Sequence, residues 1–237
     1  MKTIHFETID STNTYLKENY SKLDDFTFVS ADFQSKGRGR NNRNWKSEKG
    51  ESLLFSLLIK DESLMKEFKS LSIISALSLI QAFETMGIKD LSIKWPNDIY
   101  YKDNKLVGIL LEAVSTTKLE CLIVGIGINV NQKEFEGDYK RQPTSLYRIL
   151  NKDIDIDNLK NVVYQKLEEN FSLVKKRFDF YSEITKYDYL KNKELDAYLD
   201  DEKMPIKVIG INNDYSLKIV VNNQIRDIES GEISFHV

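Results

Sequence analysis

Residues 36–45 have the sequence KGRGRNNRNW, in which basic and amide side chains are interrupted only by glycine and one tryptophan. The stretch has almost no apolar surface to bury, so we predict that it is a loop. Arg38, Arg40 and Arg43 suit an anionic ligand, because guanidinium groups bind phosphate or carboxylate through two parallel hydrogen bonds. Taken alone, the loop is slightly better explained as a solvated basic segment, or as a nucleic-acid patch in which Trp45 stacks on bases.

The chain on both sides of this loop contains apolar strands and helices. Short runs of β-branched and aromatic residues predict strands, and apolar residues spaced three or four apart predict helices. Ser11 is expected to cap a short helix. The expected strands are residues 3–9, 26–33, 53–59, 91–95, 99–101, 106–114 and 119–130, with a hairpin turn at Asp103-Asn104. The expected longer helices are residues 65–86 and 159–178.

The pattern changes after about Tyr187 to short strands separated by asparagine-rich turns. These strands are expected at residues 206–211, 217–221, 225–228 and 233–235. We therefore predict two domains. Residues 1–188 would contain the larger sheet, and residues 189–237 would form a small C-terminal β-barrel.

The composition is that of an ordinary globular protein, with 41% hydrophobic and 30% charged residues. A net charge of −3 gives no support for a general affinity for nucleic acid, although a local patch would still be able to bind it. Cys121 is the one cysteine, which excludes an internal disulfide and a cysteine-rich metal site. The first residues lack the apolar core of a signal peptide, and no run of about 18 apolar residues is present. We expect a cytoplasmic protein that does not enter a membrane.

Two further segments place polar groups at strand ends. Residues 94–98 (KWPND) leave a strand sharply at Pro96, and ligands often bind at strand ends, but composition alone favours a plain turn. Residues 105–112 (KLVGILLE) begin with a lysine that either steers a phosphate or, as is more common, faces solvent. Glu112 is unusual in this segment, because an unpaired carboxylate in an apolar strand is costly.

Residues 125–131 (GIGINVN) contain two glycines of a dinucleotide-binding fingerprint. The third glycine is missing and the segment continues as a strand, so we reject a Rossmann site. Glycine within a strand instead indicates close approach by a ligand or by backbone. The chain contains no P-loop motif, so any ATP is bound in another way.

The order of these segments resembles the catalytic domain of biotin–protein ligases. The matching motifs are STN (11–13), Gln34, GRGRxxRxW (37–45), KWPND (94–98), KxxGIL (105–110) and GIGINVN (125–131). The resemblance runs from about Ile9 to Asn131 and resumes at GEIS (231–234). The sequence departs from the family pattern at Lys36, Asn42 and Ser52.

The resemblance implies an α+β fold, in which helices flank a mixed or antiparallel sheet as in class II aminoacyl-tRNA synthetases, with a small C-terminal β-barrel. It implies a ligase that forms biotinyl-5′-AMP from biotin and ATP with release of pyrophosphate. The biotinyl group would then pass to a lysine of a biotin carboxyl carrier protein, and Mg²⁺ would accompany the ATP. Because members of the family often dimerise through a sheet edge, a homodimer is a further expectation.

The resemblance also implies a role for each matching residue. The biotin-binding residues would be Ser11, Thr12, Asn13, Gln34, Arg38, Gly39, Arg40, Lys105, Gly108 and Leu110. The ATP-binding residues would be Arg40, Arg43, Trp45, Asn97, Lys105 and Asn129. Arg38, Arg40 and Lys105 would be the catalytic residues, and Asp98 would bind Mg²⁺. Lys105 would lie where the biotin carboxylate meets the α-phosphate.

Two alternatives compete with this prediction. A lipoate–protein ligase shares the fold and the adenylation step, but its pattern has adjacent glycines after an arginine pair, and this chain contains no Gly-Gly. A nucleic-acid-binding module would use the basic loop and Trp45, but the net charge and the separate KWPND segment disfavour it. Some family members carry an N-terminal winged helix. Ser11 lies almost at the start of this sequence, so we expect no DNA binding.

Overall fold

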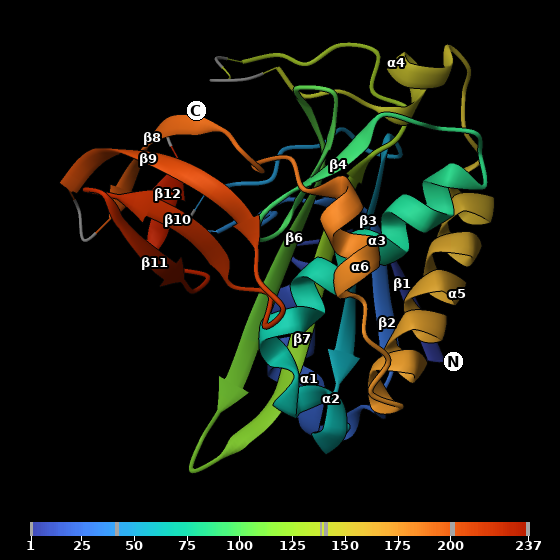
Figure 1. The fold of residues 1–237 in the computed structure, drawn as a ribbon. Helices are drawn as coiled ribbons and strands as arrows, with labels where there is room; N and C mark the ends of the chain where they lie inside the picture. The colour runs from blue at the N-terminus through green and yellow to red at the C-terminus, as the bar shows by residue number, and fades with distance from the viewer. Residues whose placement is uncertain (1, 41–42, 138, 140–141, 200–201, 236–237) are drawn as a thin grey trace.

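A seven-stranded sheet forms the centre of the molecule (Figure 1). The computed structural model describes residues 2–40, 43–137, 139, 142–199 and 202–235. The strands are β1 (Lys2–Ile9), β2 (Thr27–Gln34), β3 (Ser52–Ile59), β4 (Leu91–Lys94), β5 (Asp98–Tyr101), β6 (Asn104–Ser115) and β7 (Leu119–Asn129). They lie in the order β1-β2-β3-β7-β6-β5-β4. β1 and β2 are parallel and the other neighbours are antiparallel, which confirms the predicted mixed sheet.

Helices cover both faces of this sheet. On one face α3 (Phe68–Glu84) and α5 (Ile156–Lys175) pack together over the main hydrophobic core. On the other face α1 (Thr12–Asn19) packs over a smaller core that contains Leu16 and Leu58. Successive side chains of a strand point to opposite faces, so Leu57 joins the main core while Leu58 contacts the α1 side.

The helix predicted at residues 65–86 is two helices in the structure, α2 (Glu62–Lys66) and α3. The chain leaves helical geometry at Glu67, where ψ is 21°. Asp61 caps the separate start of α2, because its carboxylate accepts hydrogen bonds from the backbone N–H groups of Ser63 and Leu64. The apolar spacing of the sequence continues through this break, so periodicity alone does not reveal it.

The helix predicted at residues 159–178 is shifted towards the N-terminus. α5 begins at Ile156 after the Asp155 cap, and it ends at Lys175 because Arg177 adopts a positive φ of 59°. The short elements η1 (Tyr20–Lys22), α4 (Leu146–Leu150), α6 (Tyr181–Ile184) and η2 (Thr185–Tyr187) were not predicted. Among the described residues, no helix combines the length and the apolar character needed to cross a membrane.

A second sheet of five antiparallel strands follows at the C-terminal end (Figure 1). Its strands are β8 (Glu194–Leu199), β9 (Glu202–Ile211), β10 (Leu217–Val221), β11 (Gln224–Ile228) and β12 (Ile233–Phe235). They lie in the order β11-β10-β9-β8-β12. This sheet stands where the small barrel was predicted, and β8 has no counterpart among the predicted strands.

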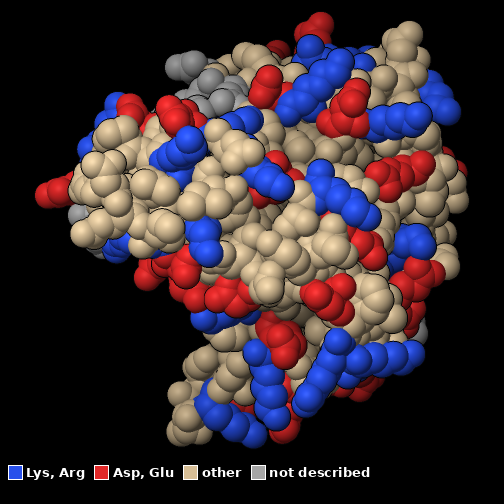
Figure 2. Space-filling view, viewed as in Figure 1, with Lys and Arg blue, Asp and Glu red and all other residues tan. Residues whose placement is uncertain are grey.

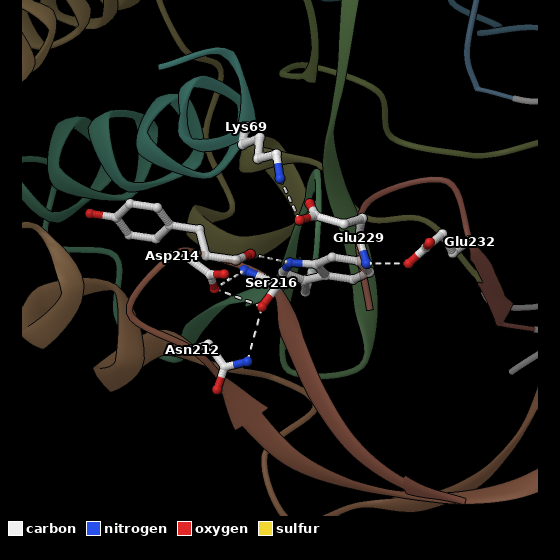
Figure 3. A network of polar contacts seen from close by, with 8 residues as sticks. Lys69, Asn212, Asp214, Ser216, Glu229 and Glu232 are labelled. Atoms are coloured by element: carbon white, nitrogen blue, oxygen red, sulfur yellow. Dashed lines mark hydrogen bonds and ion pairs between the residues drawn. The ribbon is translucent and has the colours of Figure 1, made fainter. Parts of the chain in front are cut away.

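Polar contacts join the C-terminal sheet to the larger sheet and its helices (Figure 3). The indole N–H of Trp95 donates to the carbonyl of Tyr215 at 2.9 Å, and Lys69 on α3 forms an ion pair with Glu229 at 2.5 Å. The main hydrophobic core also continues from the large sheet into the C-terminal strands, as far as Ile233. These contacts hold the C-terminal sheet against α3 and against the segment that follows β4. The division into domains 1–188 and 189–237 stays a prediction.

Candidate ligand-binding site

A cavity of about 230 Å³ is enclosed by the loop of residues 36–45, strands β5 to β7, the start of α1 and strand β12. The predicted site residues that line it are Ser11, Thr12, Asn13, Gln34, Arg38, Gly39, Arg40, Arg43, Trp45, Asn97, Asp98, Lys105, Gly108 and Leu110. Asn129 is not among the lining residues. It is buried at the end of β7 and donates to the carbonyl of Thr144 at 3.0 Å. The fold thus brings together segments that are far apart in the sequence.

The start of α1 forms a neutral, polar end of the cavity. The backbone N–H of Thr12 donates to Oε1 of Gln34 at 2.7 Å, and the Thr12 hydroxyl lies 2.6 Å from the Ser56 hydroxyl. Ser56 in turn donates to Oδ1 of Asn13. Thr12, Asn13 and Ser56 are almost fully buried, so their polar groups depend on one another or on a ligand. This end offers both donors and acceptors to a neutral ring.

Glycines of β6 and β7 leave room for two side chains of the site. A Cβ atom at Gly125 would lie 2.1 Å from Oδ1 of Asn13. Cβ atoms at Gly108 and Gly127 would lie 2.7 Å and 2.6 Å from the indole of Trp45. Real contacts are never that short, so only glycine allows the indole to lie across both strands. The strand glycines are closely approached, as predicted, but the approaching groups are the side chains of Asn13 and Trp45, whereas the sequence had suggested a ligand or backbone.

The described parts of the loop, residues 36–40 and 43–45, pair with each other as the two arms of a narrow hairpin and are held by backbone hydrogen bonds. The N–H of Gly39 donates to the carbonyl of Arg43 at 2.7 Å, and the N–H of Trp45 donates to the carbonyl of Gly37 at 2.9 Å. A Cβ atom at Gly37 would lie 2.5 Å from the Trp45 carbonyl oxygen, so the close pairing requires glycine there. Asn42, one of the departures from the family pattern, lies outside the described residues.

The opposite end of the cavity is cationic. Its basic lining residues are Arg40, Arg43, Lys94 and Lys105, and Asp98 is the one carboxylate among the described lining residues, whereas Arg38 lies beside the polar end and pairs with Glu112. Lys105 forms an ion pair with Asp98 at 2.7 Å, and Arg40 donates to Oδ1 of Asn97 at 2.9 Å. Burial lowers the pKa of the Arg40 guanidinium, and the negative charge of Asp98 opposes that effect. Lys105 therefore faces this cavity, which suits an anionic ligand.

The cavity also has lining residues that the sequence did not predict. They include Phe55, Lys94, Trp95, Ile126 and the β12 residues 233–235. Lys94 and Trp95 belong to the KWPND motif, so their position next to Asn97 was a usable signal. Phe55 and Ile126 lie within apolar strands, where the sequence does not distinguish a lining residue from a core residue.

Comparisons with known proteins point to one family. A model described as the biotin/lipoate A/B protein ligase family matches residues 5–129. The bifunctional ligase/repressor BirA of Bacillus subtilis is 36% identical over 132 residues, which are 54% of this chain but only 41% of that protein. The corresponding protein of Escherichia coli is 27% identical over 229 residues, which are 95% of this chain and 71% of that protein.

A solved structure of similar fold is the biotin protein ligase of Aquifex aeolicus in complex with biotin and ATP. It has a TM-score of 0.86 and 34% identity, and the match covers 98% of this chain and 97% of that one. The family model spans more than half of the chain and includes the loop, the KWPND segment and residues 125–129 of the GIGINVN segment, which line or border the cavity. The chain therefore belongs to the biotin/lipoate A/B protein ligase family.

Proposed function

We propose that the chain is an ATP-dependent biotin–protein ligase. The observation that carries the proposal is the division of one cavity into a neutral polar end at Thr12 and Gln34 and a cationic end at Arg40 and Lys105. Biotin has the same division, with a neutral ureido ring and an anionic carboxylate. The solved relative that holds biotin and ATP matches nearly the whole chain.

The first step would join two anions. The biotin carboxylate attacks the α-phosphorus of ATP, a new P–O bond forms, and the bond to the pyrophosphate oxygen breaks. Arg40 and Lys105 would neutralise charge where the two anions meet, and this help is largest in the transition state. Lys105 would exchange its ion pair with Asp98 for the reacting oxygens. The step needs no protein nucleophile, which agrees with a Cys121 that is fully buried and lies outside the cavity lining.

The second step would pass the biotinyl group to a lysine of a biotin carboxyl carrier protein. The amine attacks the acyl carbon of biotinyl-AMP, an amide forms and AMP leaves. Until the amine arrives, water must be kept from the mixed anhydride. The described residues of the loop line the cavity, and the Trp45 indole lies against Gly108 and Gly127, where it would face the adenine side. The loop would therefore exclude water.

Mg²⁺ would accompany the nucleotide. Asp98 is the one carboxylate among the described lining residues, and the described part of the chain contains no cluster of three His, Cys, Asp or Glu side chains. This donor set fits an ion that is held mainly by phosphate oxygens and water, with Asp98 as a single protein ligand. When bound, Mg²⁺ would neutralise phosphate charge.

The charge distribution gives no support to the nucleic-acid alternative. On the face drawn in Figure 2, lysine and arginine side chains are interspersed with aspartate and glutamate. The three arginines of the loop line the cavity, although Arg38 and Arg43 are also exposed to solvent. The sequence-based expectation of a small anionic ligand is therefore preferred.

The test is pyrophosphate release in a single turnover with Mg-ATP and either biotin or lipoate. Release that requires biotin, and that disappears when lipoate replaces it, is the expected result. A Thr12→Val variant removes one hydroxyl of the polar end while keeping the side-chain shape, and it should weaken biotin binding. Release that depends on lipoate, or on neither acid, would contradict the proposal.

A further inference from the structure

Glu112 is a largely buried carboxylate on β6 for which the two reaction steps above have no use. Its side chain is only 14% exposed. It is bound by Arg38 through both carboxylate oxygens, at 3.0 Å to Oε1 and 3.3 Å to Oε2. Nδ2 of Asn13 donates to Oε2 at 2.8 Å, and Lys17 lies 3.6 Å from Oε1. The unusual carboxylate of the apolar strand is therefore fully paired.

These partners belong to two different parts of the site. Arg38 is on the hairpin that lines the cavity, whereas Asn13 is at the polar end next to α1. Glu112 is thus joined by direct hydrogen bonds to the hairpin and to the polar end at once. Lys17, on the exposed side of α1, adds a second positive charge next to the same carboxylate.

The carboxylate also sets the direction of a chain of hydrogen bonds. An ionised carboxylate only accepts, so Asn13 must turn Nδ2 to Glu112 and Oδ1 to Ser56. Ser56 then uses its one proton on Asn13, so it can only accept in its 2.6 Å contact with the Thr12 hydroxyl, which also lies within 3.1 Å of Oε1 of Gln34. The hydrogen-bond donors therefore run from Ser56 through Asn13 to Glu112.

We propose that Glu112 is a positioning residue that couples closure of the hairpin to the orientation of the Asn13 amide. The proposal rests on the proposed function, because it assigns biotin to the polar end. When Arg38 pairs with Glu112, the hairpin is closed, and the Glu112 carboxylate, which is the last acceptor in the series of hydrogen bonds, has its cationic partner. When Arg38 leaves, the buried carboxylate loses its bidentate partner, so the polar end and the hairpin change together.

The informative variant is Glu112→Gln, which keeps the shape and removes the charge. A neutral amide both donates and accepts, so it no longer fixes the direction of the Asn13 amide, and it cannot form an ion pair with Arg38. We expect biotin to bind about tenfold more weakly and biotinyl-AMP to escape about tenfold faster, as is common for loss of a hydrogen bond to a charged group. Glu120→Gln is the matched control, because Glu120 accepts from Thr116 at the surface.

The two partners are separated by a double-mutant cycle with Arg38→Ala. In the Arg38→Ala background, Glu112→Gln should no longer accelerate escape of biotinyl-AMP, but it should still weaken biotin binding through Asn13. Equal acceleration in both backgrounds would overturn the coupling to the hairpin. Unchanged biotin affinity in Glu112→Gln would overturn the coupling to Asn13. A merely structural role would lower the melting temperature and leave both ligand measurements unchanged, which would also overturn the proposal.

Trypsin supplies a measurement that does not depend on catalysis. The enzyme cleaves after arginine, and the hairpin contains three arginines. In the ligand-free protein, Glu112→Gln should speed cleavage within residues 36–45 several-fold, whereas Glu120→Gln should match wild type. Equal cleavage rates would reject the contact between Glu112 and the hairpin. If wild type formed no biotinyl-AMP, the proposed function would fail while this cleavage result would still decide the role of Glu112 at the hairpin.

Discussion

Gly127→Ala tests quantitatively how closely the Trp45 indole packs on Gly108 and Gly127, which we call the glycine floor of the cavity. The added Cβ would lie 2.6 Å from Cε2 of the Trp45 indole. Carbon atoms in contact need about 3.5–4.0 Å, so the indole must move by about 1 Å. A displacement of about 1 Å within a catalytic site can lower the rate about 10²-fold. We therefore expect biotin-dependent pyrophosphate release to fall about 10²-fold, and the free energy of unfolding to fall by about 1 kcal/mol, because a loop side chain yields more readily than a core one.

Single-turnover pyrophosphate release measures this effect, and Trp45→Ala supplies the matched background. Without the indole, the three closest contacts of the new methyl group are removed, so Gly127→Ala should cost less than about twofold in the Trp45→Ala protein. Thermal unfolding of all four proteins shows whether the fold is kept. The role of the glycine floor is refuted if Gly127→Ala retains the wild-type rate, or if it loses the same factor in both backgrounds.

Three further predictions concern single side chains. Lys105→Ala should slow pyrophosphate release about 10²–10³-fold, while the biotin affinity measured by calorimetry changes little. Lys105→Arg should restore little of the rate, because a planar guanidinium does not replace a compact ammonium. Near-normal release from Lys105→Ala would disprove the catalytic assignment of Lys105. Arg40→Ala removes the contact to Asn97, so biotinyl-AMP should escape faster than it does from wild type and label lysines of bystander proteins, and retention as long as in wild type would reject a lid role. Burial raises the pKa of the Cys121 thiol to about 11, so iodoacetamide at pH 8 should label Cys121 only after unfolding, and rapid labelling of the folded protein would contradict the packing.

The sequence predicted those parts of the cavity that come from short segments of unusual composition. The loop of residues 36–45 and the KWPND segment are unusual enough in composition to mark functional positions, and the fold places both at the same cavity. The seven-stranded mixed sheet followed from apolar runs and from the resemblance to a known family. The sequence also showed that a carboxylate at Glu112, within an apolar strand, would be costly without a partner. It did not show that Arg38 and Asn13 are its partners.

Other features depend on three-dimensional contacts that leave no local signal. Ser56 is one serine within an apolar strand, and only the packing of α1 over β3 reveals that it completes the polar end. Asn129 stands in a glycine-rich motif that borders the site, but the residues that follow β7 draw its amide towards Thr144. The break at Glu67 lies inside a continuous apolar spacing, so it depends on the Asp61 cap.

Biotin ligation is tested most directly by the intact mass of a biotin carboxyl carrier domain after incubation with the full chain and Mg-ATP. In the presence of biotin, we predict that the carrier gains the mass of one biotinyl group on its acceptor lysine, and that a carrier in which this lysine is replaced by arginine gains nothing. With lipoate in place of biotin, no mass should be added. A carrier that stays unmodified with biotin, or that gains a lipoyl group, would contradict the assignment of this chain as a biotin–protein ligase.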